Sequence, residues 1–227
     1  MESTLAMPDG ATLQAGIIHR VWSVFFLAAI GVAGTVYVLI FWSLIRYRRR
    51  DDRLPPQFKV HTPAEIAFTV IPVLIVIGLF AVTYAAEQRI EHLDPQPAAR
   101  IRVTGFDWSW RFAYAGGGPI VTGTPQRPPV LVVPVGRTVR IDITSADVDH
   151  SFYVPGFLFK RDAIPGLVSS FDWVVTKPGL YRGECAEFCG LDHAAMNFTV
   201  SAVTQPAYEE WLRGQRTARR PRPTGPP

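Results

Sequence analysis

Two long apolar stretches near the N-terminus limit what this chain can fold into. Residues 21–45 contain no charged side chain, and residues 64–86 contain one carboxylate, Glu65, near their beginning. Each stretch exceeds the roughly 20 apolar residues that a helix needs to cross a bilayer. A removable signal peptide would have a basic start and a shorter apolar stretch, whereas residues 1–19 contain no Lys or Arg. We therefore predict two retained transmembrane helices.

The segment between the two stretches, residues 46–63, carries five arginines and one lysine. Basic loops next to membrane spans stay on the cytoplasmic side. The N-terminal segment 1–20 and the whole chain beyond the second span are then expected on the outer side. The sequence predicts a membrane hairpin with both termini outside.

Beyond a linker at residues 87–99, the composition changes to short apolar or alternating runs separated by Gly and Pro. Such runs predict an all-β sandwich or barrel with antiparallel strands, over residues 100–204. Residues 205–227 are expected to form a short helix followed, from residue 216, by a basic disordered tail. The expected strands are 100–105, 108–114, 130–136, 138–146, 169–176, 179–184 and 197–203.

The net charge of +4 does not indicate a nucleic-acid partner, because the basic residues are clustered at 46–53 and 216–223. The chain has no Gly-rich phosphate loop and no alternation of aromatic and basic residues of the kind that binds single strands. It also offers no nucleophile or acid–base pair for catalysis of its own. We expect no nucleic acid among its partners.

Both cysteines of the chain lie in the stretch "CAEFCGLDHAAM", residues 185–196. Cys185, Cys189, His193 and Met196 follow the pattern C-x3-C-x3-H-x2-M, between two expected strands. A second histidine, His150, comes just after the expected strand 138–146. Because loops between strands can gather at one end of a sandwich, all five side chains could form one metal site.

Three kinds of site are compatible with this spacing. A disulfide between Cys185 and Cys189 would close a very small loop and stabilise the fold little. Structural zinc would take the two Cys and two His side chains and leave Met196 in the core. The soft thioether of Met196 favours copper. Two thiolates suit two copper ions, because each thiolate would bridge both ions.

Two segments resemble subunit II of the haem–copper respiratory oxidases, the CuA-bearing subunit of cytochrome c oxidase. They read "TSADVDHSFYVPGFLFKRDAIPG" (144–166) and "GECAEFCGLDHAAM" (183–196), and they follow a two-helix hairpin as in that family. The resemblance covers about residues 15–210 and implies a cupredoxin-like Greek-key domain. It further implies an oxidoreductase complex of a bacterial plasma membrane or its equivalent. There the subunit passes electrons from cytochrome c to haem in subunit I, where dioxygen is reduced to water and protons are pumped.

The resemblance also implies a ligand set for a binuclear copper centre (CuA). Cys185 and Cys189 would bridge the two copper ions, and each histidine would bind one of them. Met196 would complete one site and the backbone carbonyl of Glu187 the other. The carboxylate of Glu187 would reach a magnesium ion shared with subunit I. The implied metal ligands are His150, Cys185, Glu187, Cys189, His193 and Met196.

Two further residues match functional positions of the family. Trp108, in "GFDWSWRF", corresponds to the point at which electrons arrive from cytochrome c, although strand packing would also explain it. The family usually has an aromatic residue between the two tryptophans, where this chain has Ser109. Glu65 corresponds to a carboxylate at the mouth of a proton path into subunit I. A carboxylate that stabilises the start of a helix is an equal alternative for Glu65.

The implied partners are subunit I, other oxidase subunits, lipid, and a cytochrome c or a membrane-attached cytochrome c domain. Residues 100–204 carry nearly equal numbers of basic and acidic side chains, which predicts a weakly charged or membrane-attached donor. We expect Asp147 and Asp149, which flank His150, to contribute to a partner surface. The alternatives are a stand-alone membrane-tethered copper-binding protein and a quinol-oxidase subunit, whose family members have lost the copper ligands.

Overall fold

The computed structural model describes residues 7, 10–50 and 59–218. It divides into two compact units, His19–Gln88 and Met1–Ile18 together with Arg89–Pro227. We call the first the helical hairpin and the second the β domain. The middle of the basic loop (51–58) and the end of the tail that we predicted to be disordered (219–227) lie outside the described residues.

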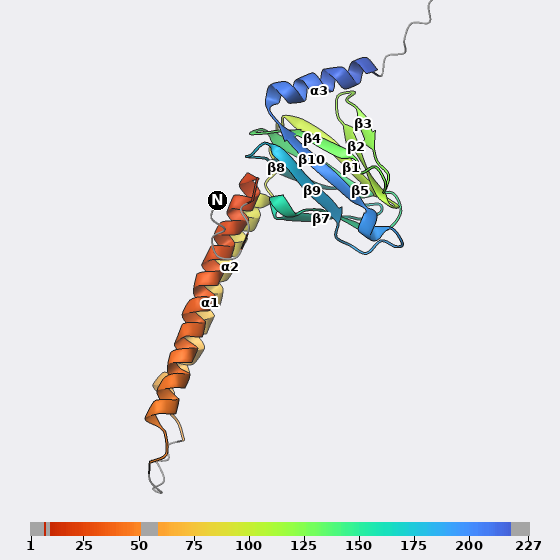
Figure 1. Ribbon diagram of the computed structural model, residues 1–227. Helices are drawn as coiled ribbons and strands as arrows, with labels where there is room; N and C mark the ends of the chain where they lie inside the picture. Colours follow the sequence, from red (N-terminus) through yellow and green to blue (C-terminus); the bar gives the residue numbers. More distant parts are fainter. Residues whose placement is uncertain (1–6, 8–9, 51–58, 219–227) are drawn as a thin grey trace, which may run out of the picture. The chain divides into compact units, whose positions relative to one another are not determined.

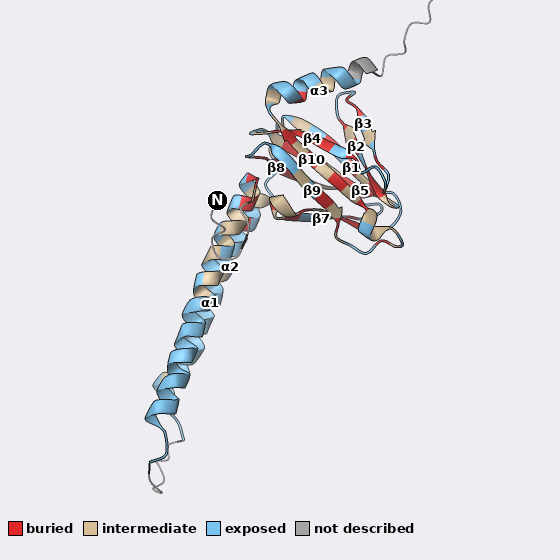
Figure 2. Cartoon of the chain, viewed as in Figure 1, coloured by how far each residue is buried: buried red, intermediate tan, exposed pale blue. Residues whose placement is uncertain are grey.

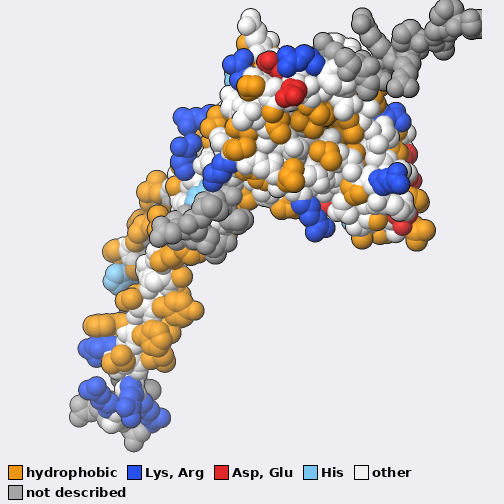
Figure 3. Space-filling view, turned by 45° about the horizontal axis from the view of Figure 1, so that its top comes forward, with side chains coloured by type: hydrophobic (Ala, Val, Ile, Leu, Met, Phe, Trp, Pro, Cys, Tyr) orange, Lys and Arg blue, Asp and Glu red, His pale blue; other side chains and the backbone are white. Residues whose placement is uncertain are grey.

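The helical hairpin contains most of α1 (Leu13–Arg46) and of α2 (Thr62–Ile90), which lie side by side (Figure 1). Both helices are long and apolar enough to cross a membrane, and their most apolar windows have no buried residue. Figure 2 shows both helices exposed over most of their length, and apolar side chains cover the surface seen in Figure 3. Lys and Arg gather at the end of the hairpin in the same view. An apolar surface all around a helix suits lipid rather than water.

The start of each long helix is capped by a side chain. Thr12 Oγ1 accepts a hydrogen bond from the backbone N–H of Ala15, 3.0 Å away, at the start of α1. At the start of α2, Glu65 Oε1 accepts from the backbone N–H of His61, and His61 Nδ1 accepts from that of Ala64. These bonds satisfy N–H groups that have no partner within the helix.

The β domain contains two five-stranded sheets, with strand orders β3-β2-β1-β5-β8 and β4-β10-β9-β6-β7 (Figure 1). The predicted all-β sandwich is therefore confirmed. The strands are β1 (Ala99–Phe106), β2 (Ser109–Tyr114), β3 (Ile120–Thr122), β4 (Val130–Pro134), β5 (Thr138–Ser145), β6 (His150–Val154), β7 (Phe159–Ala163), β8 (Ser169–Val174), β9 (Gly179–Cys185) and β10 (Asn197–Val203).

The sheets differ from the sequence prediction in two respects. The strand pairs β1–β5 and β4–β10 are parallel, whereas we predicted antiparallel strands throughout. The prediction also missed three strands, β3, β6 and β7. β7 reads "FKRDA", and such charged residues are typical of an edge strand, which is its position in the sheet. His150 therefore begins a strand instead of lying in a loop.

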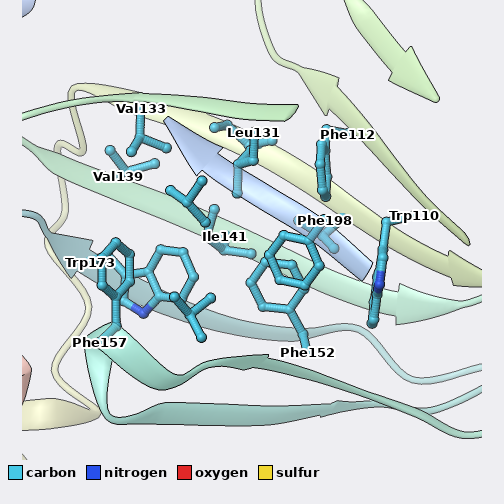
Figure 4. Packing of buried hydrophobic residues seen from close by; sticks show 14 of the residues in the cluster. Trp110, Phe112, Leu131, Val133, Val139, Ile141, Phe152, Phe157, Trp173 and Phe198 are labelled. Carbon is cyan, nitrogen blue, oxygen red and sulfur yellow. The ribbon is translucent and has the colours of Figure 1, made fainter. Parts of the chain in front are cut away.

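Aromatic side chains from both sheets fill the core beneath the start of β6 (Figure 4). The rings of Phe152 and Phe198 stack with centroids 4.3 Å apart, and Trp110 meets Phe152 edge-on at 5.2 Å. Trp173 stacks on Phe152 from the other side. The Trp110 ring also contacts the ring of His150, with centroids 6.0 Å apart. Close packing of this kind holds the start of β6 in one position.

Residues just before and at the start of α1 complete one edge of the β domain. The backbone N–H of Ala11 donates to the carbonyl of Gly156, and Thr12 forms an antiparallel bridge with Val175. The backbone N–H of Val174 donates to Gln14 Oε1. Both Ala11 and Thr12 are buried. The segment 11–14 thus packs as part of the β domain, although the residues that it contacts come much later in the chain.

A C-terminal helix, α3 (Gln205–Ala218), covers another part of the β domain. Its apolar face packs on the core through Tyr208, Trp211 and Leu212. The Trp211 ring lies 4.9 Å from that of Tyr114. Helix α3 continues to Ala218, so the first three residues of the segment that we predicted to be disordered are helical.

A buried ion pair joins the linker after α2 to the β domain. Arg140 and Asp172 face each other across β5 and β8, and their guanidinium and carboxylate groups form two hydrogen bonds. Asp94 completes the group: its N–H donates to Asp172 Oδ2 at 2.6 Å, and its carbonyl accepts from Arg140 at 2.7 Å. The hydrogen bond with Asp172 raises the pKa of Arg140, although burial opposes the charge.

Arg140→Ala should lower the free energy of unfolding of the β domain by about 3–5 kcal/mol, because it leaves the buried Asp172 carboxylate without its partner. Arg100→Ala is the matched control. Its contact with Asp142 is 3.9 Å long and its side chain is 53% exposed, so we expect a loss of about 0–1 kcal/mol. Urea unfolding of the detergent-solubilised chain, followed by tryptophan fluorescence, would measure both. Equal losses would show that the buried pair adds nothing.

Candidate metal centre

The side chains of the candidate site come from two neighbouring strands of one sheet and from the segment that follows the second of them. His150 begins β6 and Cys185 ends β9, and these strands are adjacent, with Phe152 opposite Cys185. The segment between β9 and β10 carries Cys189 and, in a short 3-10 helix, His193. The order of strands therefore brings His150 to the cysteine segment, as the sequence led us to expect.

Four candidate ligand atoms lie close to the two cysteine sulfur atoms, which are 3.9 Å apart. His150 Nδ1 is 3.9 Å from the sulfur of Cys185, and His193 Nδ1 is 3.5 Å from that of Cys189. Met196 Sδ lies 3.8 Å from Cys189 Sγ. Each thiol is therefore accompanied by one imidazole nitrogen.

The fourth atom near the sulfurs is the backbone carbonyl of Glu187, 3.3 Å from Cys185 Sγ. The side chain of Glu187 is exposed and points to no partner within the described residues. The backbone carbonyl of Glu187 thus faces the sulfur of Cys185, whereas its carboxylate is accessible at the surface.

The site is nearly closed to water. His150 is fully buried, Met196 is 1% exposed and each cysteine is 7% exposed, whereas His193 is partly exposed. Burial opposes ionisation of Cys185, but hydrogen bonding, with His150 first, lowers the pKa of this thiol. Burial and the neighbouring charge of Cys185 raise the pKa of Cys189. The pair therefore holds one negative charge more readily than two, and a metal ion would displace the remaining proton.

This donor set fits a soft metal ion. Two thiols, two imidazole nitrogens and a thioether are linked by contacts of 3.9 Å or less to a cysteine sulfur, and His150, Cys185 and Cys189 form a compact ligand group. Met196 faces Cys189 instead of packing only among apolar side chains. Thioether and thiolate ligands together are typical of copper, whereas zinc sites use Cys, His and carboxylates.

Trp108 lies on the turn between β1 and β2 and bonds to the cysteine segment. Its indole Nε1–H donates to the carbonyl of Cys189 at 2.9 Å. The ring also packs on Gly190, whose φ of +115° favours glycine and whose missing side chain leaves room for the indole. The Trp108 side chain is partly exposed. An aromatic ring thus reaches from the surface to the backbone of a metal-ligand candidate.

Asp147 has contacts that the sequence did not reveal. Its Oδ1 lies 2.8 Å from His150 Nε2, and its Oδ2 accepts from the backbone N–H of Asp107 at 2.7 Å. Partial burial opposes the charge of Asp147, but hydrogen bonds with Asp107, His150 and Val148 outweigh it and lower the pKa of the carboxyl group. An acidic residue three positions before His150 was the only sign of this contact in the sequence.

Glu65 belongs to the helical hairpin, where its described contact is the cap at the start of α2. This contact is the one that the helix-capping alternative predicts. The proton-path role stays a prediction.

The comparisons with known proteins identify the family. A family model described as the transmembrane domain of cytochrome c oxidase subunit II matches residues 1–84, and one described as its periplasmic domain matches residues 127–203. A probable cytochrome c oxidase subunit 2 from Streptomyces avermitilis is 34% identical over 249 residues, 92% of this chain and 78% of the relative. The chain belongs to the cytochrome c oxidase subunit II family.

Other relatives agree with this assignment. Cytochrome c oxidase subunit 2 of Mycobacterium tuberculosis is 31% identical over 268 residues, 92% of this chain and 74% of the relative. The crystal structure of the periplasmic domain of subunit II of cytochrome oxidase from Bradyrhizobium japonicum is 30% identical, with a TM-score of 0.51. The match covers 56% of this chain and 99% of that one. The predicted cupredoxin-like fold is confirmed.

Membership of the subunit II family fixes several properties. The chain is a membrane-anchored subunit of cytochrome c oxidase, a haem–copper oxidoreductase complex, and it associates with other oxidase subunits. Its β domain corresponds to a domain on the outer side of the membrane. The family also implies copper, to which the residues of the candidate site are suited.

The charges of this subunit II chain are unevenly distributed over the β domain. The loops at the metal end, residues 107–108, 146–149 and 186–196, contain no Lys or Arg. They contain five acidic residues: Asp107, Asp147, Asp149, Glu187 and Asp192. The near-neutral balance of the whole domain therefore hides a locally acidic end around Trp108.

Proposed function

We propose that this chain accepts electrons from a cytochrome c at a binuclear CuA centre and passes them to haem in subunit I. There dioxygen would be reduced to water and protons pumped. The observation that carries the proposal is the pairing of each cysteine sulfur with one histidine nitrogen. One copper ion would need a single thiolate, whereas two pairs of one thiolate and one imidazole suit two copper ions.

The ligand atoms divide into bridging and terminal groups. The sulfurs of Cys185 and Cys189, which face each other, would bridge. His150 and His193 would each hold one copper ion, with Met196 and the Glu187 carbonyl as weaker ligands. Copper held in this way supplies one-electron redox chemistry. The buried setting excludes water from the thiolates and keeps the ligands in place.

Trp108 would receive the electron from the donor. Its partly exposed ring and its hydrogen bond to the Cys189 carbonyl provide a short connection between the surface and a bridging ligand. Glu187, whose carboxylate is exposed, would bind a magnesium ion shared with subunit I. Glu65 would stand near the mouth of a proton path into subunit I, in addition to capping α2.

The orientation that we propose places both termini and the copper domain outside, in a bacterial plasma membrane or its equivalent. The hydrogen bonds of residues 11–14 with Gly156 and Val174 support it, because segments that pair in one sheet lie on the same side of a membrane. In this orientation, residues 21–45 and 64–86 would form the two spans. Residues 46–63 would form the cytoplasmic loop, and residues 100–204 the copper domain.

The acidic metal end suggests a donor cytochrome c with a basic docking surface, in place of the weakly charged donor that the overall composition suggested. The rate of reduction by such a cytochrome should fall steeply as ionic strength rises, because salt screens the attraction that steers the encounter. Stopped-flow measurements from low to physiological salt would test this. A rate that does not depend on salt would instead favour a weakly charged or membrane-attached donor.

Optical and electron-paramagnetic-resonance spectra of the copper-loaded full chain in detergent test the proposed function. We expect a purple protein whose hyperfine pattern requires two equivalent copper nuclei. Chelation of the metal should remove both features. A pattern from one nucleus would overturn the binuclear centre in favour of a one-copper site, and a colourless protein that holds zinc would overturn the electron-transfer role.

A further inference from the structure

We propose that Asp147 is a positioning residue for the copper centre. One oxygen of its carboxylate would fix the ring of the ligand His150, and the other would fix the turn that carries Trp108. The inference rests on the proposed function, because it concerns a ligand of the same copper centre.

The first contact determines which nitrogen of His150 is free to bind metal. The ring is fully buried, its Nδ1 faces Cys185 Sγ and its Nε2 lies 2.8 Å from Asp147 Oδ1. A carboxylate accepts a hydrogen bond and so keeps the hydrogen on Nε2. Nδ1 is then left with a lone pair that points toward the sulfur atoms. Metal-binding histidines are commonly held in this way by a carboxylate on the second nitrogen.

Asp147 is itself held in place by its own loop. Its Oδ1 also accepts from the backbone N–H of Val148 at 2.7 Å, and its backbone N–H donates to Ser145 Oγ at 3.2 Å. The Asp147 side chain is 31% exposed, so the carboxylate keeps these contacts although solvent reaches it. The carboxylate is thus anchored independently of the histidine that it contacts.

The second contact connects the same carboxylate to Trp108. Asp147 Oδ2 accepts from the N–H of Asp107 at 2.7 Å, and Trp108, the next residue, donates its indole N–H to the carbonyl of Cys189. The contacts therefore form a closed cycle. It runs from His150 through Asp147, Asp107 and Trp108 to Cys189, and returns through Cys185 to His150. The ligand and the electron-accepting side chain share one anchor.

His193 lacks an equivalent anchor. Its Nδ1 faces Cys189 and its ring meets that of Phe188, with centroids 5.7 Å apart. Within residues 7, 10–50 and 59–218, no carboxylate contacts the His193 ring. The two histidines therefore differ in their surroundings, and the loss of Asp147 should affect one half of the centre.

The hydrogen bond should also affect the redox equilibrium. A carboxylate on Nε2 increases the electron density that the ring gives to a metal, which favours the more highly charged oxidised state. Asp147→Asn removes the charge and keeps the shape of the side chain. We expect copper affinity to fall about 10- to 100-fold. We expect the equilibrium to shift about tenfold toward the reduced state, which is about +59 mV for one electron.

Asp149→Asn is the matched control, because it removes the same charge from the same loop. Asp149 is exposed, and neither His150 nor the Trp108 turn is among its contacts. Midpoint potential and copper affinity would be measured on the copper-loaded full chain in detergent. We expect Asp149→Asn to leave both close to their unmodified values. Equal behaviour of the two variants would overturn the proposal, since only a general surface charge would then be involved.

A second measurement decides the matter if Asp147→Asn fails to fold. Nitrogen-15 NMR of the histidines in the copper-free, unmodified chain reports which ring nitrogen carries hydrogen. Hydrogen on Nε2 of His150 is the expected result, and hydrogen on Nδ1 would contradict the proposal. This measurement needs no copper, so it is independent of the two-copper spectrum that tests the proposed function.

Discussion

Cys185→Ser is expected to abolish the two-copper spectrum of the full chain. The Cys185 sulfur lies among His150 Nδ1, the Glu187 carbonyl and the second sulfur, so one substitution removes one of the two atoms that we propose as bridges. A serine hydroxyl is a hard ligand that does not replace a bridging thiolate. Electron-paramagnetic resonance should show a one-nucleus pattern or no bound copper, and oxidation of cytochrome c by the complex should be lost.

Met196→Leu is the matched control for this loss. Met196 is 1% exposed and reaches one sulfur, Cys189 Sγ, at 3.8 Å. Leucine keeps nearly the same volume, so the packing of the site should survive. The two-nucleus pattern should persist in Met196→Leu with altered splitting and potential. A two-copper spectrum in Cys185→Ser would refute the bridging role of this cysteine.

Trp108→Ala is expected to slow electron arrival from cytochrome c by about 100-fold, the scale on which misplacement of a reacting group reduces a rate. The substitution removes both the partly exposed ring and its hydrogen bond to the Cys189 carbonyl. The ligand side chains keep their own contacts, so the copper spectrum should change little. Stopped-flow reduction by cytochrome c would measure the rate, and flash-induced transfer from copper to haem should stay near normal.

Trp211→Phe controls for the loss of an indole elsewhere in the β domain. Trp211 packs on Tyr114 from α3 and contacts no candidate ligand among its ring partners. Its substitution should leave the rate of reduction by cytochrome c unchanged. If cytochrome c reduced the copper of Trp108→Ala as fast as that of the unmodified chain, electrons would have to arrive through another residue.

The sequence alone was sufficient to predict the membrane hairpin and the all-β class, because both depend on local patterns of apolar residues. The parallel pairs could not be predicted in the same way. Residues such as Ala99 and Val139 pair across some forty positions, and no local pattern records that contact. β7 was missed because its central residues are charged, which its edge position allows.

Most candidate ligands could be found from their spacing, since Cys185, Cys189, His193 and Met196 lie in one short stretch. The contacts that hold them could not. The bond from Trp108 to Cys189 joins residues 81 positions apart, and Asp107 lies 40 positions from Asp147. Asp147 looked like one of two similar acids beside His150, and only the fold shows that one of them holds the ring. Spacing identifies the donors, and the tertiary structure identifies what orients them.

The edge formed by residues 11–14 has a consequence for how the protein is made. Gln14 bonds to Val174, 160 positions later, so a segment that leaves the ribosome early completes a structure that is synthesised late. In the proposed orientation, this segment must cross the membrane before the β domain can close. If residues 11–14 crossed the membrane late, the edge near Val175 would stay unpaired and open to non-native strand pairing. In that orientation, folding of the β domain outside the membrane would depend on the insertion of the N-terminal end of the chain.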